Sequence, residues 1–311
     1  MRNIPKEMGQ ILDERIVSTM KYKFLILFLA AALTALLYPP LASAIPGPIL
    51  NSAQSFAVLA GSAVSNTGAT KITGDLGVSP GTAITGFPPG SVDGTIYSAG
   101  AVALGAQSDV TTAYTGLAGM PVSETLTGQN LGGLTLAPGV YFFATTAQLT
   151  GTLTLDAEGY NNAYWVFQIG TSLTTASASS VNVIDLGSNH GKDDGVFWVV
   201  GSSATLGSTT AFEGNILAKA SITLITGATI LNGRALAETG GVTMDTNTIS
   251  NLCPNGGPGY SGGLEYSSGT SGTIVPIGLS KGPPVPEPST MLLLGSGLAG
   301  LAAFRKRFKK A

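Results

Sequence analysis

The sequence predicts a mainly β fold in which short strands stack into a solenoid, with one long α-helix packed alongside. First, short alternating runs of small, apolar and Thr residues recur, and Thr205, Thr223 and Thr243 are 18 and 20 positions apart. Second, the chain has 43 Gly among 311 residues and only 10% charged residues, against the ~25% that is usual. Third, apolar residues between 98 and 117 change to a helical spacing. Strands that return regularly, with glycine between them, are typical of a solenoid.

Each repeated run places one Thr and one small residue on the same side of a strand. Alternation with period two indicates a strand with one buried face, so the apolar residues point inward and the hydroxyl residues outward. Stacking would bring these Thr into a column at the ~4.7–4.9 Å spacing of neighbouring strands. The interval from Thr174 to Thr205 is longer because it contains the polar insert 188–195. The predicted column is Thr152, Thr154, Ser172, Thr174, Ser203, Thr205, Ser221, Thr223, Gly241 and Thr243.

The N-terminal segment, residues 1–44, is predicted to be an extension followed by a secretory signal peptide. A basic stretch begins at Met20, residues 24–37 are apolar, and small residues lead to a cleavage site after Ala44. This order is that of a signal for export. Met20 suits a start codon better than Met1, because it would put the basic residues at the N-terminus.

The folded domain is predicted to be 45–251, followed by a linker at 252–284 that is rich in Gly, Pro and Ser. Such a composition favours a flexible, partly extended tether. Cys253 lies at its start and is expected to be inert. Within the domain, an amphipathic helix is predicted from about Ser98 to Gly119. Its apolar stripe is Val102, Ala106, Val110, Ala113, Tyr114 and Leu117.

The C-terminal segment, residues 285–311, combines a short motif, an apolar run at 291–304 and a basic tail. The motif is Val285, Pro286, Glu287 and Pro288. Fourteen residues at ~1.5 Å rise are short for a ~30 Å span, although a basic flank can snorkel. The order of these parts resembles a PEP-CTERM sorting signal of Gram-negative bacteria. The resemblance implies transient membrane anchoring, an exosortase-type sorting enzyme as partner, and delivery to the cell surface or extracellular matrix; an ordinary tail anchor is the alternative.

The domain as a whole resembles the microbial ice-binding (antifreeze) family. The runs that carry the resemblance are 56–90, 126–155, 166–170, 196–201, 214–218 and 233–237. The family implies a right-handed discontinuous three-faced β-solenoid, with one long helix alongside and a rung order in space that differs from the order in sequence. It also implies an ice-binding site on one flat face, to which small N-terminal residues such as Ala60 and Ser62 can add.

The sequence gives little basis for an enzyme or a cofactor. The single His190 lies in a polar insert, where a solvated surface position is expected. No His and Cys have the spacing of metal ligands, and the acidic residues are scattered rather than clustered. A net charge of −2 gives no electrostatic basis for nucleic-acid binding. We therefore expect no catalytic residues, no metal and no cofactor.

The outward hydroxyl column favours binding to an ordered surface. Restricted χ1 of Thr keeps methyl and hydroxyl groups in register, so we expect an exported protein that adsorbs to ice, depresses the freezing point and inhibits recrystallisation. An extracellular-matrix structural protein or adhesin on the same scaffold is the alternative. A carbohydrate-active solenoid is weaker, because Trp165 and Trp198 lie in apolar strands. A second column that competes for the ice site is Ser177, Ser208, Thr226 and Thr246.

Overall fold

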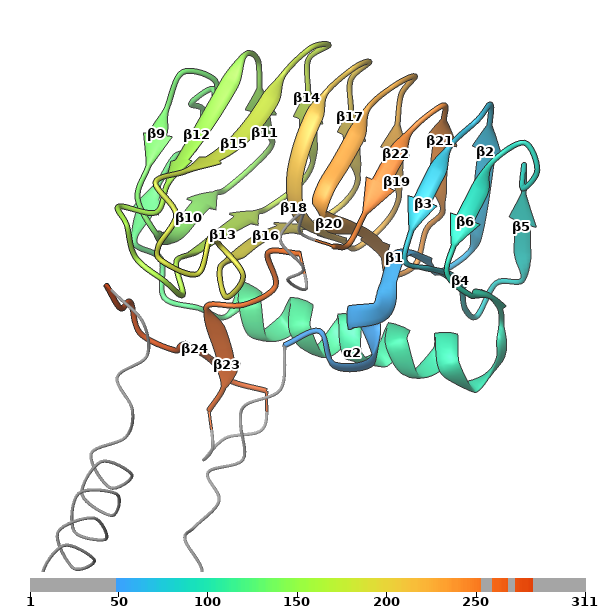
Figure 1. Cartoon of the computed structure of the whole chain (residues 1–311), viewed down its shortest axis with the longest axis horizontal. Coiled ribbons are helices and arrows are strands. Elements are labelled where there is room, and N and C mark those ends of the chain that lie inside the picture. Colours follow the sequence, from blue (N-terminus) through green and yellow to red (C-terminus); the bar gives the residue numbers. More distant parts are fainter. Residues whose placement is uncertain (1–48, 253–258, 268–271, 282–311) are drawn as a thin grey trace, which may run out of the picture. The chain divides into compact units, whose positions relative to one another are not determined.

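Parallel strands in the described chain wind into a β-solenoid with three faces (Figure 1). This computed structural model describes residues 49–252, 259–267 and 272–281. The predicted signal peptide, Cys253 and the motif 285–288 lie outside these residues. The solenoid and its helix confirm the predicted fold class.

The helix face is the side of the solenoid against which the long helix packs. Its central strands are buried on both sides, because one side lines the interior and the other contacts the helix. Continuous apolar runs such as 195–200 follow from this two-sided burial. In spatial order its strands are β8 (Glu124–Thr125), β10 (Gly139–Phe143), β13 (Tyr164–Ile169), β16 (Gly195–Val200), the ends of β18 (Ala211–Ala218) and β20 (Thr229–Ala237), β1 (Phe56–Ala60), β4 (Asp75–Val78) and β7 (Ile96–Ser98).

The ladder face is a separate seven-stranded parallel sheet. Its strands are short and alternate between buried and more exposed residues, as expected when only one side is covered. In spatial order they are β11 (Ala147–Leu149), β14 (Leu173–Thr175), β17 (Ala204–Leu206), β19 (Ile222–Leu224), β21 (Val242–Asp245), β2 (Ala63–Thr67) and β5 (Ala83–Thr85).

The third face completes each rung and leads back to the helix face. Residues of β18 and β20 run through this corner without a break in the strand, which joins the third face and the helix face into one sheet. Its strands are β9 (Thr135–Leu136), β12 (Thr152–Asp156), β15 (Ser180–Ile184), the starts of β18 and β20, β22 (Thr248–Ser250), β3 (Lys71–Thr73) and β6 (Ser91–Asp93).

The order of rungs in space differs from the order in sequence, as the resemblance implied. The first strands of the domain stack on its last ones: Val58 pairs with Ala235, Val64 with Val242 and Ile72 with Ile249. Figure 1 shows the blue N-terminal strands beside the orange C-terminal ones. The discontinuity arises because the chain leaves β7 through the helix and resumes at the far end of the stack.

The interior is filled by apolar side chains that repeat from rung to rung. Phe167 and Trp198 stack with ring centroids 4.0 Å apart, and Tyr141 and Phe212 extend this column at 5.6 and 4.9 Å. Trp165 and Trp198 are fully buried, so neither lies on an outer face. Stacked aromatic pairs of this kind add to the stability that comes from burial alone.

Helix α2 (Gly100–Ala118) lies along the helix face, within two residues of its predicted bounds. Ala103, Ala106, Val110 and Leu117 are buried against the strands. The predicted stripe is wrong at its start, because Val102 is 52% exposed and Ala103 takes its place. Three of the buried helix residues, Ala103, Ala106 and Ala113, are small.

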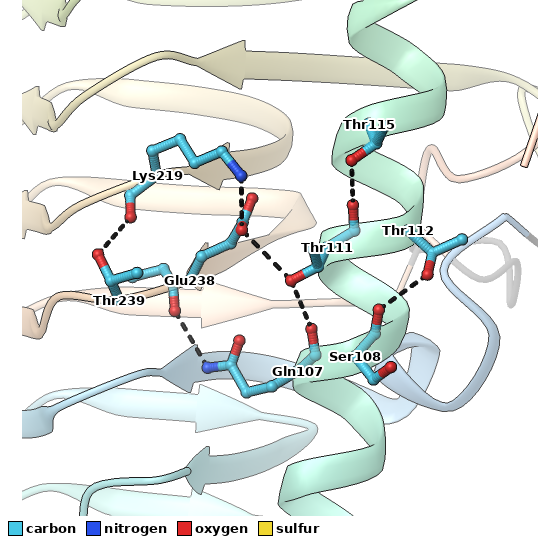
Figure 2. Close-up of polar contacts among 9 residues, drawn as sticks. Gln107, Ser108, Thr111, Thr112, Thr115, Lys219, Glu238 and Thr239 are labelled. Carbon is cyan, nitrogen blue, oxygen red and sulfur yellow. Dashed lines mark hydrogen bonds and ion pairs between the residues drawn. The ribbon is translucent and has the colours of Figure 1, made fainter.

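Polar contacts hold the helix to the corner between the helix face and the ladder face. Gln107 Nε2 donates to the Ala237 carbonyl at 3.1 Å, and Thr111 Oγ1 donates to Glu238 Oε2 at 3.3 Å. The same carboxylate oxygen pairs with Lys219 Nζ at 2.8 Å. Figure 2 shows Gln107 and Thr111 on the helix, facing Glu238 and Lys219. The Glu238 side chain is 6% exposed and that of Lys219 is 41% exposed, so the removal of Lys219 would leave a largely buried carboxylate without its ion-pair partner.

The segment after the solenoid is folded onto it, so the expectation of a flexible tether is wrong for the described parts of 252–284. We call residues 259–267 and 272–281 the strap. They contain β23 (Leu264–Tyr266) and β24 (Ile274–Pro276), which pair antiparallel. Leu264 and Ile274 are 2% and 3% exposed and pack with the residues under the helix. Two buried apolar side chains outweigh the Gly- and Ser-rich composition.

Two buried carboxyl groups lie beneath the strap. Asp194 is 0% exposed; its Oδ1 accepts from the Ala163 N–H at 2.9 Å, and its Oδ2 has no hydrogen-bond partner among the described residues. Burial, with the nearby charge of Asp193, raises the pKa of Asp194 from 3.8 to about 7 despite the Ala163 hydrogen bond. Burial also raises the pKa of Glu213 to about 7. The folded chain therefore holds both protons at a pH where the unfolded chain has lost them.

We predict that the free energy of unfolding falls as pH rises from about 4 to about 7, because the folded chain binds more protons than the unfolded chain in this window. Each unit of pKa difference corresponds to about 1.4 kcal/mol. Asp194→Asn keeps an oxygen acceptor for the Ala163 N–H and should lose less stability over the same window. Urea unfolding of both proteins at about pH 4.5 and about pH 7.5 measures the difference; an equal loss in both would contradict it.

A second prediction concerns the stacked glycines at the corner between the helix face and the ladder face. A Cβ at Gly201 would lie 2.3 Å from the Gly170 carbonyl oxygen of the next rung, so Gly201→Ala should destabilise the fold by about 1–3 kcal/mol. Gly105→Ala is the matched control, because a Cβ there meets its nearest atom at 3.9 Å and alanine favours a helix by about 0.5–1 kcal/mol. Thermal unfolding should show a lower Tm for Gly201→Ala and a higher Tm for Gly105→Ala than for the parent protein. Equal shifts in Tm would exclude close stacking at Gly201.

Candidate functional site

Four of the predicted Thr residues lie side by side on the ladder face. Thr174 pairs with Thr205, Thr205 with Thr223, and Thr223 with Thr243, each in parallel register. Their neighbours Leu173, Ala204, Ile222 and Val242 are buried, so the Thr side chains point outward. Parallel pairing without a register shift places them at the ~4.7–4.9 Å inter-strand spacing.

The small residues that precede these strands form a second row on the ladder face. Ala204 N–H donates to the Ser221 carbonyl at 2.9 Å, and Ile222 N–H donates to the Gly241 carbonyl at 3.0 Å, which continues the register beyond the strand ends. All four of these small residues are half-buried. Its predicted members Ser172, Ser203, Ser221 and Gly241 follow one another in successive rungs.

Thr152 and Thr154 do not belong to this ladder, which corrects the predicted column. They lie on β12 of the third face, where Thr154 pairs with Asn182 and Thr135. In the same rung Gln148 takes the ladder position, opposite Thr174. Each rung contains two short alternating strands, one on the ladder face and one on the third face. The alternation alone does not reveal which of these two faces a strand joins.

Two ladder positions were missed because they are distant in sequence. Ser65 pairs with Thr243, and Thr85 pairs with Ser65, so the N-terminal strands extend the ladder beyond its last predicted member. The local signal was present, since 83–85 (Ala-Ile-Thr) resembles the repeated run. Of the N-terminal residues expected to add to the face, Ser62 is exposed at its edge, whereas Ala60 is wrong because it is fully buried in β1.

The competing second column lies at the corner between the ladder face and the third face. Backbone hydrogen bonds from Ala178 to Ser208 and from Thr209 to Thr226 stack this corner. Thr246 has φ 56° and is displaced by one position, so Asp245 follows Thr226 in the stack and accepts a hydrogen bond from its hydroxyl. A charged residue and left-handed backbone make this column less suited to a flat neutral surface.

Charge separates the two solvent-exposed faces. Among the described residues, the outward positions of the ladder face are Thr, Ser, Ala, Gly and Gln, with Asp245 at the edge. The third face carries Asp156, Glu213, Lys71 and Asp93 on its strands. The carboxyl groups with raised pKa values, Asp194 and Glu213, therefore lie away from the ladder. Of the two solvent-exposed faces that the described residues form, the ladder face is the one that is uncharged over several rungs.

The ladder face presents a regularly spaced array of side chains rather than a cluster of reactive groups. Neighbouring Thr in the ladder repeat at the strand spacing, and the two rows lie two residues apart along each strand, or ~6.8 Å at ~3.4 Å rise. Restricted χ1 holds each methyl and hydroxyl in place. His190 is exposed in its loop. In the described part of the chain, no group of three or more His, Cys, Asp and Glu could hold a metal ion, and no helix is long and apolar enough to cross a membrane.

Comparison with known proteins identifies relatives along most of the chain. Residues 58–250 match the family described as Ice-binding-like, and residues 284–307 match the PEP-CTERM protein-sorting motif. An ice-binding protein from Nostoc sp. (strain HG1) is 50% identical over 264 residues, which are 84% of this chain and 88% of the relative. One from Flavobacterium frigoris (strain PS1) is 34% identical over 65% of this chain and 75% of its own.

Solved structures agree with these sequence matches. The crystal structure of an ice binding protein from an Antarctic biological consortium is similar, with a TM-score of 0.61 and 46% identity over 68% of this chain and 95% of that one. An ice-binding protein from an Arctic yeast has a TM-score of 0.59 and 30% identity over 67% and 97%. Because the family match spans more than half of its residues and the Nostoc relative aligns over most of both lengths, the chain belongs to the Ice-binding-like family.

Proposed function

We propose that this protein binds ice through its ladder face. The observation that carries the proposal is the uncharged, in-register row of Thr174, Thr205, Thr223 and Thr243, extended by Ser65 and Thr85, in a chain of the Ice-binding-like family. The half-buried row Ser172, Ser203, Ser221 and Gly241 runs parallel to it.

The physical basis is a rigid two-dimensional array of weak contacts. The Thr methyl groups order nearby water and the hydroxyl groups hydrogen-bond to it, so water at the face adopts a lattice-like arrangement. Little side-chain entropy is lost on docking, because χ1 is already restricted. Each contact is weak, and affinity arises because many are made at once. Adsorbed protein then curves the growing crystal front, which lowers the freezing point and slows recrystallisation.

This function requires no catalytic residue, cofactor or metal. The curated relatives are ice-binding proteins rather than enzymes, which supports a non-enzymatic role for this chain. The scattered acidic residues and the uncharged ladder also give no basis for a nucleic-acid partner.

The ends of the chain suit export and surface sorting. We expect cleavage after Ala44 by the export machinery, and recognition of the motif 285–288 by an exosortase-type enzyme, with transient membrane anchoring by the apolar run 291–304. The match of 284–307 to the PEP-CTERM protein-sorting motif supports this route. The protein would then act at the cell surface or in the extracellular matrix of a Gram-negative bacterium. A purely structural or adhesive role of the scaffold is less favoured, because adhesion does not require a neutral ladder in strict register.

Thr205→Tyr or Thr223→Tyr should raise the protein concentration needed to inhibit ice recrystallisation by at least about tenfold, which corresponds to about 1.4 kcal/mol. The bulky ring would lift the ladder away from the lattice without disturbing the interior. Thr152→Tyr is the matched control, since Thr152 is exposed on the third face. It should retain full activity. If the control lost activity and the ladder variants kept it, the site would lie on the third face.

Ser65→Tyr should have the same effect as Thr223→Tyr, although the two residues are far apart in sequence. The reason is the parallel pairing of β2 with β21, which places Ser65 next to Thr243. Thermal hysteresis of the purified variant measures this, with circular dichroism as a check of the fold. Full activity of Ser65→Tyr would limit the ice-contacting surface to the C-terminal rungs.

A further inference from the structure

The strap runs along the corner between the third face and the helix face. Gly195 forms an antiparallel bridge with Ser261, and Val196 N–H donates to the Tyr260 carbonyl at 2.8 Å. Further along, Asn161 bridges to Ser280. Gly195 follows the turn that leads from β15 to β16, and Asn161 lies in the turn from β12 to β13, so both anchor points belong to this corner.

Buried groups of the solenoid hold the start of the strap in place. Arg234, which is 1% exposed, donates through Nη1 to the Gly259 carbonyl at 3.0 Å and to Asn215 Oδ1 at 2.7 Å. Asn215 Nδ2 in turn donates to the Tyr260 carbonyl at 2.7 Å. Gly262 N–H donates to the Asp194 carbonyl at 2.9 Å. These contacts come from side chains and backbone that are themselves fixed in the core.

The middle and end of the strap are also attached. Leu264 and Ile274 pack with the residues under α2, and Tyr266 Oη donates to the Ile49 carbonyl at 2.8 Å. At the last described residues, Lys281 Nζ lies 4.3 Å from the centroid of the Tyr160 ring. Ile49 and Lys281, the first and last of the described residues, thus both contact the strap or belong to it.

In a solenoid with three faces, the corner between the third face and the helix face is the vertex opposite the ladder face. Val285, the first residue of the sorting motif, follows Lys281 by only four positions, whereas it follows Leu252 by 33. At ~3.3–3.6 Å per residue, the docked strap shortens the maximum lead to the motif from more than ~100 Å to ~14 Å.

We propose that the strap holds Lys281, which is four positions before the sorting motif, at the vertex opposite the ladder, so that a chain attached through its C-terminal region presents the ladder away from the surface that carries it. The use of this orientation rests on the proposed ice-binding and sorting roles. The docking of the strap can be tested without them. The strap thus positions the ladder relative to the surface that carries the chain.

Distances between paired spin labels test the geometry in the full chain. In a Cys253→Ser background, one label is placed at Ile277→Cys, an exposed position on the docked strap, and the other at Lys192→Cys, near the vertex, or at Thr174→Cys, on the ladder. We expect a narrow distribution for both pairs, with the Lys192 pair at the shorter distance. Leu264→Asp should release the strap, broaden both distributions and remove the difference between their means. Broad distributions for the parent, or a shorter distance to Thr174, would overturn the proposal.

Leu279→Asp is the matched control, because Leu279 is on the same strap but is 44% exposed, against 2% for Leu264. It should leave both distance distributions unchanged; an effect equal to that of Leu264→Asp would count against specific docking. If Leu264→Asp fails to fold, Gly262→Val provides the same release, since a Cβ at Gly262 would lie 2.3 Å from the Asp193 carbonyl oxygen.

Inhibition of ice recrystallisation by the unlabelled parent separates the two ideas. An inactive parent with the expected distances would refute ice binding and leave the strap geometry standing. An active parent with broad or reversed distances would refute the strap proposal alone. When the parent is coupled to beads through Val285→Cys, the beads should adsorb to ice, whereas coupling through Thr174→Cys should prevent adsorption.

Discussion

Parallel pairing between the strands of the ladder face, without a shift in register, is the constraint on which the rest of this structure depends. A slip of one residue in any ladder strand would turn its Thr inward and its apolar residue outward. The buried partners Leu173, Ala204, Ile222 and Val242 oppose such a slip, because each would lose its place in the interior. The alignment of the outward Thr side chains is therefore a consequence of the packing inside.

Interior and exterior are linked by the corners of the solenoid. Stacked glycines such as Gly170 and Gly201 let the backbones of neighbouring rungs approach, with no room for a side chain between them. The helix covers one face and anchors to the corner through Glu238 and Lys219. The third face keeps charged residues and solvent exposure. In the described part of the chain, the ladder face is uncovered and regular, and Asp245 at its edge is its one charged residue; these are properties that adsorption to a neutral lattice requires.

Local pattern predicted much of this architecture, and non-local pairing explains what it could not predict. The alternation around Thr174, Thr205, Thr223 and Thr243 correctly indicated outward Thr. The same alternation around Thr154 belongs to a different face, because strand period carries no information about which wall a strand joins. Ser65 and Thr85 were missed because their partners are set by the return of the chain through the helix. Val102 was placed in the helix stripe by spacing, whereas Ala103 is the buried residue.

The strap shows a further limit of composition as a guide. Residues 252–284 have the Gly, Pro and Ser content of a linker, yet Leu264 and Ile274 give part of the segment a buried apolar contact. Both residues pack in the same cluster as the helix, and hydrogen bonds from Arg234, Asn215 and Tyr266 add to their contacts. The residues that decide docking are few, and a compositional average hides them.

The habit of single ice crystals grown in the presence of the purified protein tests the central account most directly. Adsorption through the ladder face predicts faceted crystals that stop growing within a temperature interval below the melting point, at a protein concentration where an unrelated protein has no effect. Smooth, disc-shaped crystals that grow continuously on cooling would contradict the account.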